Sequence, residues 1–455
     1  MAASHYGWNA WSQRAFWGYD EGGHAAYALS IRETHALPHP LSGWSTFHPP
    51  AYHALAAAAW AGSEPLGPQA VLVALRAVSA AGMLLVGTVV YVLARRFTRS
   101  VAIALAAATL ALFIPAAQLA ATMVGNEALA AGFSAAALLH VVSLQRDPRR
   151  LRAAALAGLF AGLAFATKYS GAWTVATCAL PFLRRDLDRP ALRSFTVCFG
   201  LVLLVSGPVY LRNLALVGTP FPLTRALQPM KGHEERLYAG PRRLADYAHV
   251  PWSCGRYPYV TLVVERGVVA GLNPEMKSVP CLAYAGAWFD PFGVRASRAG
   301  PDDGVLWGIL LLQAGVIPTL LALAGFGLFS VRAVRSRGRA GETPLVVLTG
   351  LGIASFVSFT WMAPSLAAAK TSYLLPLAAP AGVFFASGCA LLPRAARIAA
   401  LSLSLAAAVL AAYVFTTGTV FPPAETVTSK LYWAGIGRQL PDSYIAEAAM
   451  RLLDR

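Results

Sequence analysis

Ten apolar stretches, separated by short polar segments, run through most of this 455-residue chain. They lie at residues 70–94, 101–120, 127–144, 153–168, 170–183, 194–211, 305–331, 344–361, 371–392 and 398–416. A helix needs roughly 20 apolar residues to cross the ~30 Å hydrocarbon core of a bilayer. The pattern therefore predicts an all-α polytopic membrane protein of about ten transmembrane helices. Because the two segments between 153 and 183 are short, we expect them to be tilted or to form a tight hairpin.

Composition strengthens this interpretation. Hydrophobic residues make up 57% of the chain and charged residues only 13%, whereas soluble proteins carry about a quarter charged residues. The net charge of +16 would also suit a nucleic-acid-binding protein, which usually shows one basic patch. Here the arginines form short clusters between the apolar runs, so the sequence indicates no nucleic-acid partner.

Every second loop between the apolar runs is basic. The arginines in these loops are Arg95, Arg96 and Arg99; Arg146, Arg149, Arg150 and Arg152; Arg184, Arg185, Arg189 and Arg193; Arg332, Arg335, Arg337 and Arg339; and Arg394 and Arg397. Cytoplasmic loops of membrane proteins carry such an excess of basic residues. We therefore expect a multi-pass protein of the plasma or inner membrane, with helices over 70–211 and 305–416. The segment 1–69, the loop 212–304 and the tail 417–455 are then expected outside.

The segment 1–69 contains no apolar run of spanning length and no signal peptide. Either the helix at 70–94 carries this segment across, or a further helix precedes Met1, and we favour the further helix. Within the segment, Ala25–Ile31 is expected to form a short helix. A second one follows Pro49–Pro50 and is too short to span. Its Tyr52 and Trp60 would suit the membrane interface.

Five cysteines do not form a disulfide framework. Cys178, Cys198 and Cys389 fall in apolar runs and are expected to be inert packing residues. Cys254 and Cys281 lie in the long polar loop that charge places outside. They are expected to form a disulfide if that compartment is oxidising, worth about 3 kcal/mol in the chain-entropy model, with two buried thiols as the alternative.

Polar residues near the membrane gather at one rim. Apart from Arg76, about two turns into its helix, the centres of the apolar runs carry almost no charge. The remaining charged residues near the membrane lie at helix ends that are expected to face outward; they are Glu127, Lys168, Arg212 and Lys370. Each could be an interfacial anchor that snorkels to the headgroups. As a set they favour a shared, outward-facing polar site.

An acidic pair, Asp20 and Glu21, precedes the short helix on the same side. Adjacent helical residues point ~100° apart, so the two carboxylates cannot address one atom. One is free to act on a substrate while the other orients a hydroxyl or binds a metal ion. The alternative is an acidic helix start that interacts favourably with the helix dipole.

The acidic pair, followed by His48–Pro49–Pro50 and Tyr52, resembles the C-type glycosyltransferase superfamily. Its members include dolichyl-phosphate-mannose protein mannosyltransferases and bacterial aminoarabinose transferases. The likeness continues through Arg76 and 91–95, Asn126–Glu127, 162–168, Arg212–Asn213, 218–221, 288–290 and 370–376, and covers about residues 18–390. His48 stands where many relatives have lysine, and Ser372 where many have arginine.

The resemblance implies an enzyme that moves a sugar from a polyprenyl phosphate to a hydroxyl of a glycan, lipid or protein acceptor on the outer face. It implies inversion by direct displacement, with Asp20 as the base and Glu21 holding the acceptor or a divalent ion. The implied substrate-binding residues are His24, His48, Tyr52, Arg76, Asn126, Glu127, Lys168, Arg212, Lys370 and Tyr373. The resemblance assigns no particular cofactor, and a divalent metal ion on Asp20 and Glu21 is left open.

Elementary chemistry agrees with this implication. A phosphate leaving group is already a stable anion, so it needs cations such as Lys168, Arg212 and Lys370. The attacking hydroxyl must lose a proton, for which one carboxylate suffices. Glycoside hydrolysis, in contrast, uses two carboxylates that flank the bond.

Two other functions are compatible with the architecture. A lipid or solute transporter with an outer vestibule would need charges or broken helices near the midplane, and the uncharged helix centres argue against it. A non-catalytic partner in envelope assembly would have no need of the acidic pair. The sequence identifies neither the sugar nor the acceptor, and we expect specificity to lie in the loop 212–304.

Overall fold

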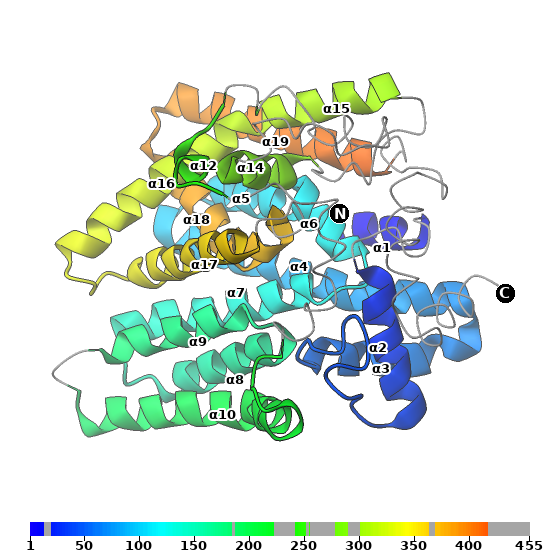
Figure 1. The fold of residues 1–455 in the computed structure, drawn as a ribbon. Helices are drawn as coiled ribbons and strands as arrows, with labels where there is room; N and C mark the ends of the chain where they lie inside the picture. The colour runs from blue at the N-terminus through cyan, green and yellow to red at the C-terminus, as the bar shows by residue number, and fades with distance from the viewer. Residues whose placement is uncertain are drawn as a thin grey trace.

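The computed structural model describes residues 1–12, 20–183, 187–222, 242–251, 254, 278–289, 301–363 and 369–416. The α-helices are α1 (Ala2–Ser12), α2 (Glu21–Thr34), α3 (Ala51–Ser63), α4 (Pro68–Thr98), α5 (Val101–Phe113), α6 (Pro115–Thr122), α7 (Glu127–Arg146), α8 (Leu151–Thr167), α9 (Gly171–Ala179), α10 (Arg189–Val217), α12 (Ala245–Ala248), α14 (Val279–Trp288), α15 (Pro301–Ala314), α16 (Val316–Arg335), α17 (Thr343–Met362), α18 (Ala378–Leu391) and α19 (Arg394–Thr416). Short 3₁₀ helices are η1 (Glu64–Leu66), η2 (Leu180–Phe182) and η8 (Thr371–Leu377) (Figure 1).

Each of the ten predicted segments coincides with helix, which confirms the all-α, multi-pass class. The count of ten is not confirmed: in the described part of the chain seven helices are long and apolar enough to cross a membrane, or eight if the bent pair α5–α6 is one span. The predicted segment 101–120 is a pair, α5 and α6, bent by 59°. Pro115 begins α6, where its fixed φ and missing N–H are tolerated. The predicted segments 153–168 and 170–183 are the shorter apolar helices α8 and α9–η2.

Small residues set the spacing between the helices. In Figure 1, α7, α8, α9 and α10 form one group, and α5, α14, α16, α18 and α19 form another. Helix α4 contacts both groups, through α7 on one side and α5 and α18 on the other. A Cβ atom on Gly82 of α4 would overlap the backbone of Ala128 in α7, and one on Gly158 would overlap the backbone of Cys198. Such close backbone approach is typical of helix packing in membranes.

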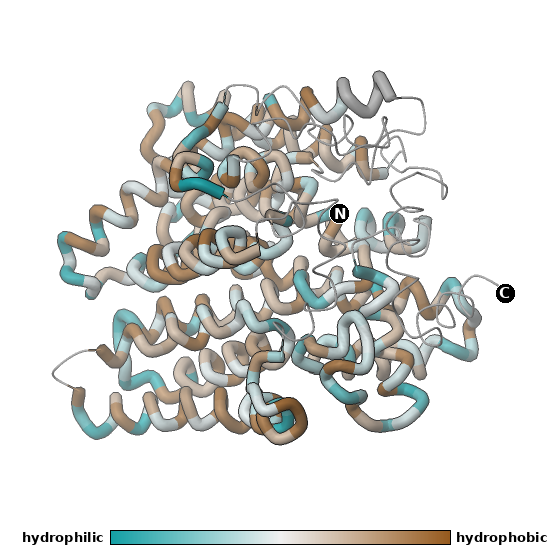
Figure 2. Tube along the Cα trace, viewed as in Figure 1, coloured by the Kyte–Doolittle hydropathy of each residue, from teal (hydrophilic) through white to brown (hydrophobic). Residues whose placement is uncertain are grey.

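The basic loops meet at one end of the bundle. Arg149 Nε lies 2.8 Å from Asp188 Oδ2, which joins the loop after α7 to the start of α10. Gln145 Nε2 donates to the carbonyl of Gly338, 2.6 Å away, in the loop after α16. Figure 1 places the start of α10 and the loop after α16 at the left, far from α2 and α3. Figure 2 shows hydrophilic residues at these helix ends and apolar residues along the helices between.

The amino-terminal segment is more helical and more buried than expected. Helix α2 extends beyond the predicted Ala25–Ile31, and α3 follows Pro50 as predicted. The side chains of Tyr52 and Trp60 are both buried within the protein. They pack with Leu75 of α4 in one apolar cluster. Two faces of α3 are thereby covered by α2 and α4, so its aromatic residues pack inside the protein.

The five cysteines form one disulfide and three free thiols. Cys254 and Cys281 are joined by a disulfide, with Cα atoms 5.5 Å apart, within the range that disulfide geometry allows. Cys178, Cys198 and Cys389 are free and buried, as packing residues should be. The tail from residue 417, most of the loop 212–304, Gly18, Tyr19 and Asp290 lie outside the described residues.

We predict that the Cys254–Cys281 bond is found in protein from an oxidising compartment. Non-reducing peptide mapping of freshly isolated membranes should yield one linked peptide pair containing both cysteines. The three buried cysteines should react with an alkylating reagent only after denaturation. Alkylation of both Cys254 and Cys281 without reduction would contradict the bond.

Candidate functional site

Asp20 is held by two donors at the start of α2. Trp44 Nε1 donates to Oδ1 over 3.1 Å, and Lys370 Nζ donates to Oδ2 over 3.2 Å. The side chain of Asp20 remains 24% exposed, whereas that of Lys370 is 11% exposed. Asp20 has a φ of 57°, in the left-handed region that aspartate tolerates better than most residues. Such strained backbone clusters at functional sites, and here it accompanies a partly accessible carboxylate.

Lys370 comes from a distant part of the chain, directly before η8. Thr371 Oγ1 donates to the carbonyl of Ala283 over 2.9 Å, which fixes this segment against α14. Burial by itself lowers the pKa of Lys370, but the charge and hydrogen bond of Asp20, together with Tyr373 and Glu127, outweigh it and raise the pKa to about 12. Lys370 is therefore a permanent cation beside Asp20.

A second ion pair lies next to the first. Lys168 Nζ is 2.7 Å from Glu127 Oε1 and 5.0 Å from the ring centroid of Tyr373. Asn126 Nδ2 donates to the carbonyl of Thr167 over 3.2 Å, which ties the start of α7 to the end of α8. The electrostatic partners of Lys370 include both Tyr373 and Glu127. Two lysines and two carboxylates thus share one region.

Neutral histidines lie between these ion pairs. His24 Nδ1 is hydrogen-bonded to His53 Nε2 over 2.9 Å, and the ring of His24 stacks on that of His48 with centroids 5.4 Å apart. Burial lowers the pKa of His24, and it lowers the pKa of His48 well below the usual value. Because His24 feels Glu127 and Asp20 as well as both lysines, it lies amid the whole group. These rings are uncharged donors or acceptors at neutral pH.

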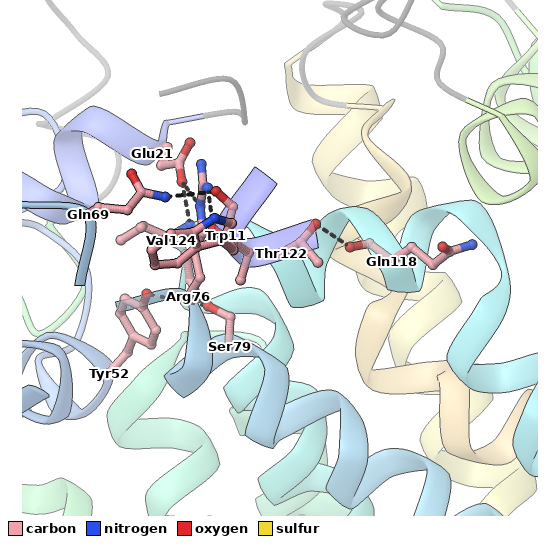
Figure 3. A network of polar contacts seen from close by, with 11 residues as sticks. Trp11, Glu21, Tyr52, Gln69, Arg76, Ser79, Gln118, Thr122 and Val124 are labelled. Atoms are coloured by element: carbon pink, nitrogen blue, oxygen red, sulfur yellow. Dashed lines mark hydrogen bonds and ion pairs between the residues drawn. The ribbon is translucent and has the colours of Figure 1, made fainter. Parts of the chain in front are cut away.

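Glu21 belongs to a separate network. Its side chain and that of Arg76 are both 0% exposed, with Arg76 Nε 3.1 Å from Glu21 Oε1. The same oxygen accepts the backbone N–H of Val124 over 3.0 Å, and Arg76 Nη1 donates to the carbonyl of Ala10 over 3.0 Å (Figure 3). As expected for neighbouring helix positions, the two carboxylates of the acidic pair address different partners. Glu21 therefore holds α2, α4 and the 123–126 segment together.

Tyr52 also lies in this network. Its hydroxyl is 3.4 Å from Ser79 Oγ, which donates to the carbonyl of Gly125 over 3.1 Å (Figure 3). Within the described residues, no group of three or more histidines, cysteines or acidic residues is placed to hold a metal ion. Glu21 faces Arg76, whereas Asp20 faces Trp44 and Lys370.

Arg212 does not join the lysines. Its Nη2 donates to the carbonyls of Leu37 and Pro38 over 3.0 and 2.7 Å, in the loop between α2 and α3. Tyr169 donates its hydroxyl to the carbonyl of Phe47 in the same loop. Of the three cations predicted to converge, two do so, and Arg212 instead anchors the loop by satisfying its free carbonyls.

Trp44 is the site residue that the sequence did not indicate. A Cβ atom on Gly23 would lie 2.6 Å from both Trp44 Cδ1 and Ser45 Oγ. Glycine at this position is what lets the loop dock on the first turn of α2 and bring the indole to Asp20. The signal was present as two glycines directly after the acidic pair, although it names no partner.

We predict that Trp44→Phe lowers turnover about 10-fold while the donor KM changes little. The indole N–H stabilises the ionised form of Asp20, so its removal should move the acidic limb of the pH–rate profile to higher pH. Trp60→Phe, a buried tryptophan in α3, is the matched control. An equal loss at every pH would show that Trp44 acts only in folding.

Comparisons with known proteins agree with this geometry at the level of fold. Residues 48–209 match the model of the family described as dolichyl-phosphate-mannose-protein mannosyltransferase. The oligosaccharyltransferase of Archaeoglobus fulgidus in its apo form superposes with a TM-score of 0.51 at 14% identity, over 93% of this chain and 55% of that one. Its complex with an inhibitory peptide and a dolichol-phosphate gives a TM-score of 0.50 at 14% identity, over 93% and 54%.

A third structure is ArnT from Cupriavidus metallidurans bound to undecaprenyl phosphate, with a TM-score of 0.39 at 17% identity, over 85% of this chain and 76% of that one. No curated protein matches the chain in sequence. The chain spans about half the length of the oligosaccharyltransferase. Fold and site together define a multi-pass membrane protein with the fold of the C-type glycosyltransferases. Its resemblance to dolichyl-phosphate-mannose-protein mannosyltransferases is confirmed over residues 48–209.

Proposed function

We propose that this protein is a glycosyltransferase that takes a sugar from a polyprenyl-phosphate donor and passes it to an acceptor hydroxyl. The observation that carries the proposal is the partly exposed Asp20 carboxylate, held between Trp44 and Lys370. A carboxylate in hydrogen-bond reach of a hydroxyl can take its proton as the hydroxyl attacks. Direct displacement needs only this one base, and it inverts the configuration at the anomeric carbon.

The cations of the site suit a phosphate leaving group. Lys370 and Lys168 are each paired with a carboxylate, so neither ammonium group is buried without a partner before the donor binds. A phosphate arriving between them would interact with both ammonium groups, while neutral His48 could donate a hydrogen bond. Preorganised cations of this kind stabilise the charge that develops on the leaving oxygen. A divalent metal is not needed for this step.

The same arrangement favours a site on the non-cytoplasmic face. The basic loops meet at the end of the bundle opposite α2 and α3, and basic loops are typically cytoplasmic. The matched oligosaccharyltransferase has been seen with a dolichol-phosphate, and the matched family acts on dolichyl-phosphate-mannose by its description. We therefore propose a polyprenyl-phosphate sugar as the donor of this chain, and mannose is the first sugar to test.

The test uses the purified full-length chain in proteoliposomes. Polyprenyl phosphates carrying radiolabelled mannose, other hexoses or pentoses are offered together with a mixture of membrane lipids, peptides and glycans as acceptors. Transfer of label to one acceptor class, with inverted anomeric configuration by NMR, is expected. Absence of transfer and of label release from every donor, with saturable movement of an intact donor across the bilayer, would instead indicate a transporter.

A further inference from the structure

A buried carboxylate oxygen next to the site has no partner in the described part of the chain. Glu127 uses Oε1 for Lys168, whereas Oε2 is buried and accepts no hydrogen bond. Among the described residues, the ring atom His48 Nδ1 is also buried without a hydrogen-bond partner. Buried polar groups in native proteins are nearly always satisfied, so each such atom calls for an explanation.

The two atoms belong to one place. A Cβ atom on Gly125 would lie 2.9 Å from Glu127 Oε2 and 3.9 Å from His24 Cδ2, so the free oxygen is on the side of His24. His24 in turn stacks on His48, with centroids 5.4 Å apart. Glu127 is also among the charges that act on His48. A free acceptor and a free imidazole nitrogen therefore border the region between the two ion pairs.

The chemistry of these atoms selects the ligand. A carboxylate oxygen only accepts, so Oε2 requires an O–H or N–H donor. The neutral His48 ring can donate or accept at Nδ1, depending on its tautomer. A phosphate does not fit beside Oε2, because two anions would then be in contact. Neighbouring sugar hydroxyls fit both, since each hydroxyl is a donor and an acceptor.

We propose that Glu127 Oε2 and His48 Nδ1 form the subsite for hydroxyl groups of the transferred sugar, and that Glu127 selects for one particular hydroxyl. The inference rests on the proposed function and deepens it. It separates the site into a phosphate region at the lysines and a sugar region at Glu127. A site that hydrogen-bonds a substrate hydroxyl with a buried group rejects analogues that lack it, because the group is then left unpaired.

The experiment pairs a deoxy scan of the donor with variants of Glu127. The sugar active in the transfer assay and each of its monodeoxy derivatives are prepared on the same polyprenyl phosphate. With the parent protein, one derivative should lose about 10- to 100-fold in kcat/KM relative to the full sugar. With the full sugar, Glu127→Gln should lose a similar factor in kcat/KM relative to the parent protein. When Glu127→Gln is given that one derivative in place of the full sugar, its kcat/KM should fall by less than about a further 3-fold, because the interaction is already absent. The other derivatives should lose equally in both proteins.

Two further variants keep the test decisive. Glu64→Gln changes an exposed carboxylate in η1 and should reproduce the parent scan. If Glu127→Gln is not recovered folded, Glu127→Asp keeps the charge but withdraws the oxygens, and should weaken discrimination at the same hydroxyl. If every deoxy derivative loses the same factor in kcat/KM in the parent and in the Glu127 variant, the sugar subsite is overturned. The proposed sugar transfer is not affected by that result. Transfer by the parent from no donor would instead overturn the proposed function together with this inference.

Discussion

Asp20→Asn should lower the rate of sugar transfer by about 10² to 10⁴, the range attributed to a general base. Asparagine keeps the shape of the side chain and can still accept from Trp44 Nε1, but it cannot take a proton from the acceptor hydroxyl. Donor affinity should change less than turnover, since the lysines that face the phosphate remain. The measurement is single-turnover transfer in proteoliposomes at matched protein amounts.

Two comparisons make this result specific. Asp147→Asn removes an exposed carboxylate at the opposite end of the bundle and should leave transfer unchanged. Asp20→Glu keeps the base on a longer arm and should retain more activity than Asp20→Asn. Near-normal transfer by Asp20→Asn, with the protein correctly inserted, would remove Asp20 from the mechanism.

The helices were predictable because apolar runs and the residues that end them are local properties. Each predicted segment coincides with a helix, although the single predicted segment 101–120 is divided into α5 and α6 at Pro115. The number of full spans was not predictable, because a run of apolar residues does not reveal how its helix bends or tilts. The burial of Trp60 also depends on a neighbour, α4, that packs on the interfacial helix only in three dimensions.

Part of the site was predictable because charged residues in membrane proteins tend to lie at the ends of helices. Charges at the outer ends of helices were expected to gather, and Asp20, Glu127, Lys168 and Lys370 do. Which charge pairs with which depends on distances between helices, so Arg212 was placed with the lysines although it binds the carbonyls of Leu37 and Pro38. Trp44 was missed because a single indole in a polar loop carries no pattern.

The acidic pair Asp20–Glu21 also shows that the sequence does not reveal which partner each charge meets. Both side chains were assigned to chemistry on the grounds of resemblance, yet only Asp20 lies among the lysines. Glu21 is enclosed with Arg76, and removal of one partner would leave a buried, unpaired charge. Such a loss typically costs about 3 to 5 kcal/mol, whereas removal of both partners is often nearly neutral. For the Glu21–Arg76 ion pair we therefore expect each single substitution to destabilise the protein more than the double substitution does.

Glu21→Gln and Arg76→Met should each destabilise the protein by about 3 to 5 kcal/mol, and the double variant should be more stable than either. Urea unfolding in mild detergent, followed by tryptophan fluorescence, measures the free energy of each variant and hence the coupling between the two residues. The double variant should retain most of the transfer activity per folded molecule, because the two side chains are buried against each other. If Glu21→Gln instead proves as stable as the parent but inactive, Glu21 acts on the acceptor or a metal ion, and the acidic pair works as one catalytic unit.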